Sequence, residues 1–272
     1  EHKNFLFKDY STQDDYYNAM QNTVLPWEKD ETLKRQIIES KASSLNVPIP
    51  DSLSLKEQEF YLDRMFYKNA LDKVINETTL VAICKELMIL SGNDNSKSKY
   101  EDLTPSLRLE YLLALFLGKQ YGLRGLVSNI IYNEEGMPLS HAPAGKSDIL
   151  YHHEDGTYIL EPTMLRTKGQ ILNSETTNIV RHLKNEERRY PNLQFRVFMV
   201  APRVHSDVAD FFKYKAQTDN VKILPLTITK TVYLIKDNQT ILSLNEQSDL
   251  LVERLIADKD KFIDEVNAFL VG

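Results

Sequence analysis

Apolar residues recur at three- and four-residue spacing through the first part of the chain, and this spacing predicts amphipathic helices. The expected helices cover residues 33–43, 55–76, 79–90 and 104–119. Thr104 and Pro105 form a typical helix start, because threonine caps free backbone N–H groups and proline fits the first turn. We therefore predict a helical arm or linker domain over residues 1–100, with a boundary near residues 95–103.

After residue 123 the pattern changes to short apolar runs separated by polar turns, which is typical of strands. Residues 148–161 predict a β-hairpin with its bend at Asp155-Gly156, preceded by a loop over residues 133–146. Further strands are expected at residues 127–132, 195–201, 221–227 and 232–236, and helices at residues 174–189, 204–216 and 250–270. This order predicts an α/β fold, more closely an α+β mixed sheet, over residues 101–272.

Two carboxylates stand at the ends of the predicted hairpin strands. Asp148 opens the first strand, and Glu161 closes the second strand directly after the apolar run Tyr-Ile-Leu. Because the paired strands run in opposite directions, both side chains are expected at one edge of the sheet. Asp148 alone also fits a structural role in a turn, whereas an acid at the position of Glu161 is harder to explain by structure.

Three further residues are candidates for the same place. Glu175 opens the helix expected after the hairpin, where a carboxylate interacts favourably with the helix dipole. His182 lies two turns further along the same side of that helix. Glu110 lies in an otherwise apolar helical segment, so it faces either the solvent or the interior. Each of the three also fits a purely structural role.

Close carboxylates repel each other and resist joint ionisation unless a cation lies between them. Mg²⁺ is a hard cation that prefers oxygen ligands, keeps several waters and bridges to phosphate. Such an ion orients and activates a water molecule and stabilises negative charge on a phosphodiester. The acids therefore suit a Mg²⁺-dependent phosphodiesterase, although these residue types alone do not specify one.

The residues around the hairpin resemble the PD-(D/E)xK nuclease core, in which an acid opens a hairpin and Glu-x-Lys closes it. Here Ser147-Asp148 stands where the core has Pro-Asp, and Glu161-Pro162-Thr163 has threonine in place of lysine. The fuller pattern resembles the type IIS restriction and nicking endonucleases typified by AlwI and BstNBI. The matching positions are His141-Ala142-Pro143-Ala144-Gly145, Glu161-Pro162-Thr163-Met164-Leu165, Gly169-Gln170, Glu175 and Arg181-His182.

The resemblance implies a PD-(D/E)xK-like nuclease core, preceded by the helical arm, that hydrolyses one DNA strand per active site with Mg²⁺. The metal ligands that it implies are Asp148, Glu161, Glu175 and the carbonyl of Pro162. The catalytic residues that it implies are Glu110, Asp148, Glu161, Glu175 and His182. Since Thr163 replaces the usual lysine, Glu175 and Glu110 are expected to complete the metal or water shell.

The net charge of −6 is unevenly distributed along the chain. Residues 236–272 hold eight Asp/Glu against four Lys/Arg, whereas residues 161–190 hold six Lys/Arg against four Glu. The basic residues expected to contact DNA phosphates are Arg166, Lys168, Arg181, Lys184, Arg188 and Arg189. A solvent-exposed charged helix face explains the same run equally well.

The longest apolar run, residues 112–117, is too short to cross a membrane. The single cysteine, Cys84, cannot form an internal disulfide, which fits a reducing compartment. We therefore predict a cytoplasmic protein with no membrane partner. The expected partners are double-stranded DNA, a recognition domain or subunit, a second cleavage subunit, and a second copy of the chain in a transient homodimer.

The sequence favours a Mg²⁺-dependent endodeoxyribonuclease that serves as the cleavage domain or subunit of a type IIS restriction or nicking enzyme. Two alternatives stay open. A repair or transposon nuclease would share the core without restriction specificity, and a non-catalytic DNA-binding or scaffold subunit would use the acids only for structure. No glycine-rich phosphate loop, Ser-His pair or CxxC motif indicates a further class.

Overall fold

The computed structural model describes residues 31–143, 145–154, 156–219 and 223–236. The helix expected at residues 250–270 and the hairpin bend at Asp155 therefore lie outside the described residues. By contacts the chain divides into two compact units, Glu1–Asn69 and Ala70–Gly272. The predicted assignment of an arm to residues 1–100 and of a nuclease domain to residues 101–272 stays a prediction.

The first unit contains α3 (Glu31–Leu45) and the first part of α4 (Leu55–Glu77), which confirms two of the predicted helices. Glu57 caps the start of α4, because its carboxylate accepts hydrogen bonds from the Ser54 N–H (2.8 Å) and hydroxyl (2.6 Å). Ile38, Ala42 and Leu62 form the buried cluster between the two helices. This small core holds α3 against α4.

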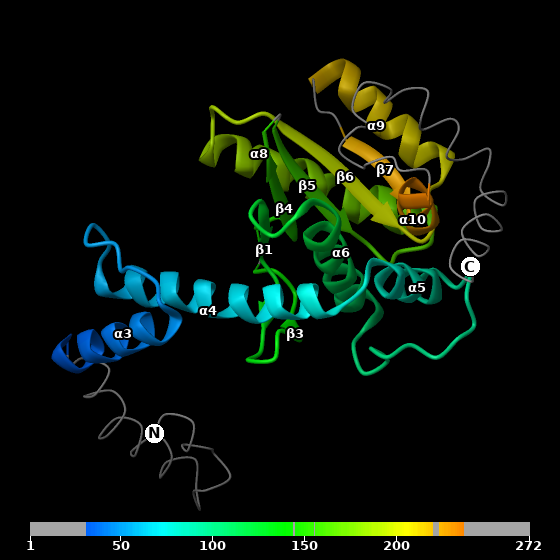
Figure 1. Ribbon diagram of the computed structural model, residues 1–272. Coiled ribbons are helices and arrows are strands. Elements are labelled where there is room, and N and C mark those ends of the chain that lie inside the picture. Colours follow the sequence, from blue (N-terminus) through cyan, green and yellow to red (C-terminus); the bar gives the residue numbers. More distant parts are fainter. Residues whose placement is uncertain (1–30, 144, 155, 220–222, 237–272) are drawn as a thin grey trace, which may run out of the picture. The chain divides into compact units, whose positions relative to one another are not determined.

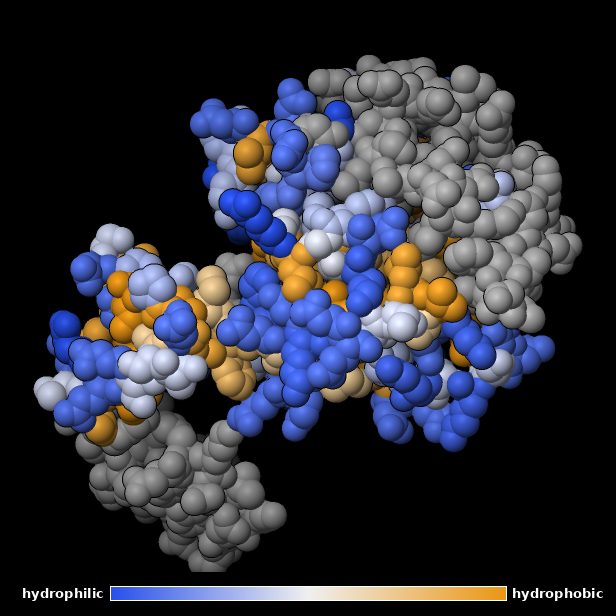
Figure 2. Space-filling model, in the orientation of Figure 1, coloured by the Kyte–Doolittle hydropathy of each residue, from blue (hydrophilic) through white to orange (hydrophobic). Residues whose placement is uncertain are grey.

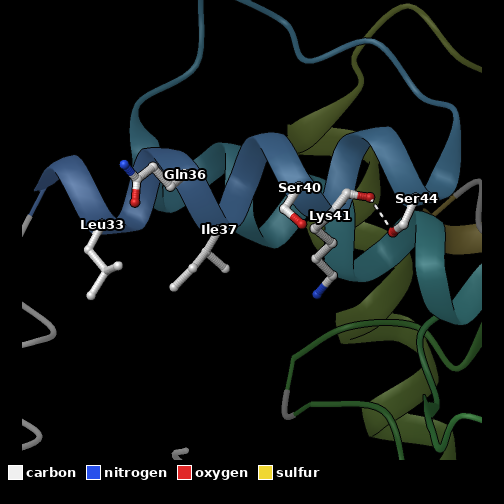
Figure 3. A pocket seen from close by; sticks show the side chains of 6 residues that line it. All are labelled: Leu33, Gln36, Ile37, Ser40, Lys41 and Ser44. Carbon is white, nitrogen blue, oxygen red and sulfur yellow. Dashed lines mark hydrogen bonds between the residues drawn. The ribbon is translucent and has the colours of Figure 1, made fainter.

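A shallow groove runs along α3, and the residues that line it are Leu33, Gln36, Ile37, Ser40, Lys41 and Ser44 (Figure 3). The Ser44 hydroxyl donates to the Lys41 carbonyl at 2.8 Å. Figure 2 shows hydrophobic residues gathered over this unit. None of the described residues that line the groove is an acid or a histidine, so these side chains do not supply the groups that phosphodiester hydrolysis needs.

The second unit is built on a five-stranded mixed sheet in the order β1-β4-β5-β6-β7 (Figure 1). The strands are β1 (Leu126–Ser128), β4 (Ile149–His153), β5 (Gly156–Pro162), β6 (Phe195–Ala201) and β7 (Ile223–Thr227). Strand β4 is antiparallel to both of its neighbours, β1 and β5, whereas β5, β6 and β7 are parallel. The predicted α/β fold with a mixed sheet is thus confirmed.

Helices cover this sheet. They are α5 (Leu80–Ser91), α6 (Pro105–Tyr121), α7 (Lys168–Gln170), η4 (Ile171–Glu175), α8 (Thr176–Arg189), α9 (Ser206–Asp219) and α10 (Ile228–Lys236). On one face of the sheet, Leu150 and Ile159 belong to the same buried cluster as Ile179 of α8 and Phe212 of α9. Helix α6 contacts β1, β4 and β5, and α5 contacts both α6 and α10. No helix in the described ranges is long and apolar enough to span a bilayer.

Three local expectations are wrong. The run at residues 127–132 is not one strand but two, β1 and β2 (Ile131–Tyr132). Strand β2 pairs with β3 (Pro138–Ser140), which lies inside the predicted loop. Residues 232–236 belong to α10 rather than to a strand, because the Thr227 hydroxyl accepts the N–H of Lys230 and starts a helix there.

We expect Gly125→Ala to destabilise the protein by about 1–3 kcal/mol, as overpacking commonly does. An added Cβ would overlap the carbonyl oxygen of His152. The N–H of His152 also donates to the carbonyl oxygen of Gly125 at 2.8 Å, and this bond ties β4 to the turn before β1. The melting temperature should then fall by about 2–4 °C for each kcal/mol.

The matched control is Gly169→Ala in α7, where an added Cβ has no neighbouring atom within 4 Å. This change should leave the melting temperature the same or raise it slightly, since alanine favours helix. Equal melting temperatures for the two variants would show that the turn tolerates a side chain.

Candidate active site

The register of β4 and β5 brings Asp148 and Glu161 together. Ile149 pairs with Leu160, so Asp148 and Glu161 lie opposite each other one step further along the hairpin. Residues directly opposite in an antiparallel pair project from the same face of the sheet. The next pair on this face is Leu150 and Ile159, which packs in the cluster with α8. As predicted, both carboxylates lie at the same end of the β4–β5 hairpin, opposite its bend. They project from the face of the sheet that α8 covers.

His182 of α8 contacts the Glu161 carboxylate directly. Its Nδ1 lies 3.1 Å and 3.0 Å from the two carboxylate oxygens. Ile179 and Leu183, which are buried in the cluster beneath α8, hold this side of the helix on the sheet. The side chain of His182 is only 14% exposed, so the packing of α8 limits the positions that the ring can take.

Glu110 of α6 points inward and joins the same group of acids. It is only 5% exposed, which decides between the solvent and interior positions that the sequence left open. Its Oε1 lies 2.6 Å from Nδ1 of His141, while its Oε2 is buried without a hydrogen-bond partner among the described residues. His141 lies in the loop motif before the hairpin, and the sequence pattern did not indicate that it meets this acid.

Glu175 does not start a helix, which corrects the expectation that the helix dipole keeps it ionised. Helical backbone begins at Lys168 and continues through the π-helical segment η4 into α8, so Glu175 lies inside a continuous helical stretch. Burial raises the pKa of Glu175, while hydrogen bonding to Thr163 and the charge of His182 oppose this rise. Thr163, which stands at the usual lysine position, is buried. Its side chain lowers the pKa of Glu175 by hydrogen bonding.

The acids act on one another through their charges. Burial raises the pKa of Asp148 well above its usual range, and the carboxylates of Glu161 and Glu110 raise it further. Burial likewise raises the pKa of Glu161 well above its usual range, and the charges of Glu175 and Glu110 raise this pKa further. Burial lowers the pKa of His182, although the charge of Asp148 opposes this. The edge of the sheet is therefore a place where negative charge is costly without a cation.

Two carboxylates and one backbone carbonyl at this place are of the types that could hold a metal ion. Within the parts of the chain that the structure describes, no group of three or more His, Cys, Asp or Glu could hold a metal ion as arranged. Mg²⁺ commonly binds through only one or two carboxylates and keeps several waters. Asp148, Glu161 and the carbonyl of Pro162 are of this kind, and the unpartnered oxygen of Glu110 lies in the same charged neighbourhood.

Three of the basic residues proposed to bind DNA are tied to the protein. Arg166 donates to the carbonyl of Ser91 at 3.4 Å, and Lys168 forms an ion pair with Asp207. Arg189 pairs at 2.9 Å with Glu186, which is buried. The contacts of Arg166 and Lys168 anchor the segment after β5 to its surroundings, whereas the Arg189 pair lies within α8.

The other three basic residues lie on the outer face of α8. Each residue advances a helix by about 100°, so Arg181, Lys184 and Arg188 share a stripe roughly opposite to the buried Ile179 and Leu183. Arg181 and Arg188 are exposed. These side chains point away from the sheet and its acids, so their expected DNA contacts would involve phosphates distant from the site.

A family model described as AlwI restriction endonuclease matches residues 4–234. The search of curated proteins found no match. Among solved structures, the chain is similar to the small subunit (R.BspD6I2) of the heterodimeric restriction endonuclease R.BspD6I. The identity is 18%, the TM-score is 0.48, and the similarity covers 68% of this chain and 96% of that chain.

We expect Asp148→Asn to stabilise the metal-free protein more at pH 8 than at pH 5. The folded-state pKa of Asp148 is raised, so the folded protein keeps a proton that the unfolded chain releases. Stability therefore falls as pH rises from the unfolded pKa, about 4, through the folded pKa. The asparagine variant lacks this loss, and its melting temperature in EDTA should exceed that of the wild type at pH 8.

The matched control is Glu101→Gln, which removes an exposed acid paired with Lys97. Its effect on the melting temperature should be small, as is usual for surface ion pairs. A lower melting temperature for Asp148→Asn at pH 8 would mean that repulsion among the acids does not strain the fold.

Proposed function

The chain belongs to the AlwI restriction endonuclease family, and on this premise we propose that it is a Mg²⁺-dependent endodeoxyribonuclease. It would act as the cleavage domain or subunit of a type IIS restriction or nicking enzyme on double-stranded DNA. The observation that carries the proposal is the pairing of Asp148 with Glu161 at one edge of the sheet. Burial raises the pKa of both Asp148 and Glu161, and the charges of Glu110 and Glu175 raise both pKa values further.

Asp148, Glu161 and the carbonyl of Pro162 are the groups that would hold the Mg²⁺ ion. When bound, the ion would neutralise the acids and stabilise the charge that develops on the phosphodiester. Its binding would offset the repulsion that raises the pKa of Asp148 and Glu161. His182 would keep the Glu161 carboxylate in one orientation through its contacts with both oxygens.

Glu175 is the best candidate for the general base. A lysine at position 163 would stabilise hydroxide by its charge, and Thr163 has none. Thr163 instead bonds to Glu175, whose pKa is raised by burial and so moves closer to the working pH of a base. Glu175 would take a proton from the attacking water, whose oxygen bonds to phosphorus as a P–O bond of the DNA breaks.

A non-catalytic DNA-binding or scaffold subunit is the second candidate function. It is favoured by the finding that no three or more His, Cys, Asp or Glu side chains in the described segments are arranged so that they could hold a metal ion. Incubation with supercoiled plasmid, in Mg²⁺ and in EDTA, separates the two functions. An active nuclease converts the plasmid to nicked or linear DNA only with Mg²⁺, whereas a scaffold subunit leaves it supercoiled.

We expect Glu161→Gln and Glu175→Gln each to lower the cleavage rate at least ~100-fold, the low end of the effect of losing an acid–base group. Glu161→Gln should be at least as damaging, because it removes a direct metal ligand. DNA affinity in Ca²⁺ should change little for Glu175→Gln, since DNA affinity rests mainly on phosphate contacts. The measurement is single-turnover plasmid cleavage together with a binding titration.

The matched control is again Glu101→Gln, which removes one negative charge in an exposed pair with Lys97 and should cleave at the wild-type rate. Full activity of Glu175→Gln would exclude this carboxylate as the base, and Lys168 would be the next residue to test.

The outer stripe of α8 generates a separate expectation for DNA binding. If Arg181 and Arg188 contact phosphates, replacing both by alanine should weaken binding to all sequences and lower the salt slope by about one per lost contact. The cleavage rate at saturating DNA should stay unchanged, because both side chains point away from the acids. An unchanged affinity and salt slope would identify the stripe as a solvent-exposed face.

A further inference from the structure

His141 contacts the buried acid of α6 from a loop that the sequence places far away. The residue follows β3 directly, and its Nδ1 lies 2.6 Å from Oε1 of Glu110, 31 positions earlier in the chain. The side chain of His141 is 50% exposed, whereas that of Glu110 is 7% exposed. A half-exposed imidazole thus reaches inward to a carboxylate that has almost no contact with solvent.

The two oxygens of Glu110 have different surroundings. Oε1 has the imidazole as its partner, and Oε2 is buried without a hydrogen-bond partner among the described residues. A buried oxygen without a partner is unfavourable by about 1–3 kcal/mol or more, so native proteins rarely keep one without a function. The same carboxylate interacts electrostatically with Asp148 and Glu161. Glu110 therefore offers a buried acceptor, Oε2, and its carboxylate acts electrostatically on the proposed metal ligands.

We propose that His141 is a positioning residue, which donates from Nδ1 to Oε1 of Glu110 and so fixes Oε2 to accept from a water of the cleavage reaction. When Glu110 is ionised, its oxygens can only accept, so in that state the hydrogen in this contact belongs to Nδ1. The inference rests on the proposed nuclease function. It assigns His141 no contact with DNA and no role in proton transfer.

His141 and His182 hold their acids in different ways. Nδ1 of His182 lies within 3.1 Å of both oxygens of Glu161, so the contact involves the whole carboxylate. Nδ1 of His141 contacts one oxygen of Glu110 and leaves the other uncontacted. An imidazole that binds one oxygen fixes the rotation of the carboxylate, which is what an acceptor for a single water requires.

The test uses three substitutions of His141 and steady-state plasmid cleavage in Mg²⁺. His141→Ala should lower kcat by about 10–100-fold, the usual effect of losing a group that orients a metal-site residue. KM should change by less than about three-fold, because positioning acts after DNA is bound. A circular dichroism melt of each variant shows whether the protein remains folded at the assay temperature.

His141→Asn and His141→Gln form a matched pair. The amide nitrogen of asparagine stands near the place of Nδ1, whereas that of glutamine extends one bond further. If His141 acts as a donor to Glu110, asparagine should restore most of kcat and glutamine should not. A merely structural loop contact would show no preference between the two amides, and that result would overturn the inference.

A double-mutant cycle with Glu110→Gln tests whether the effect passes through the carboxylate. If it does, the double variant His141→Ala/Glu110→Gln should be no slower than Glu110→Gln alone. If instead the fold-loss of kcat in the double variant equals the product of the losses in the two single variants, the inference is overturned. His152→Ala is the control, because among the described residues His152 bonds to Thr157 on the hairpin and not to an acid of the site. This variant should cleave at the wild-type rate.

Two further outcomes separate this inference from the proposed function. A wild-type chain that fails to cleave plasmid in Mg²⁺ overturns the nuclease proposal, and with it the role of His141. A wild-type chain that cleaves, with His141→Ala cleaving equally fast, overturns the inference alone. Nitrogen-15 NMR of the ring gives a second measurement: a non-protonated Nδ1 in the metal-free protein also overturns it.

Discussion

Repulsion among carboxylates that are shielded from water is the constraint on which the rest of the site depends. Glu161 closes a central strand at 5% exposure, and Glu110 is equally buried on α6. Burial raises the pKa of Asp148 and Glu161 well above the usual range, and the charges of Glu110 and Glu175 raise both pKa values further, because like charges in a poorly hydrated place cannot all ionise freely. Such an arrangement destabilises the fold at pH values where the acids ionise, and the proposed Mg²⁺ ion would offset this effect.

The surrounding elements hold this unfavourable group in place. The β4–β5 register fixes Asp148 opposite Glu161, and both strands are paired on either side. Helix α8 brings His182 to Glu161, and its buried face anchors it to the same sheet. The π-helical segment η4 lies just before α8 and ends at Glu175. Departures of this kind from regular helix are frequent at functional sites.

Most of the fold follows from the periodicity of the sequence. The hairpin was predictable because its alternating and apolar runs are bounded by turn residues, and the α6 start was predictable from Thr104-Pro105. The prediction failed at residues 232–236, where a short apolar run fits either a strand or a buried helix turn. There the hydroxyl of Thr227, at the end of β7, accepts the N–H of Lys230 and begins α10.

The sequence by itself determined that Asp148 and Glu161 share an edge, because a two-residue period and an antiparallel pairing leave little freedom within one hairpin. It did not determine which way Glu110 faces or that His141 meets it, since these residues lie on different elements 31 positions apart. Nor did it show that Glu175 lies within a continuous helical stretch and bonds to Thr163. Only tertiary packing decided these points, because contacts between distant elements depend on how the helices settle on the sheet.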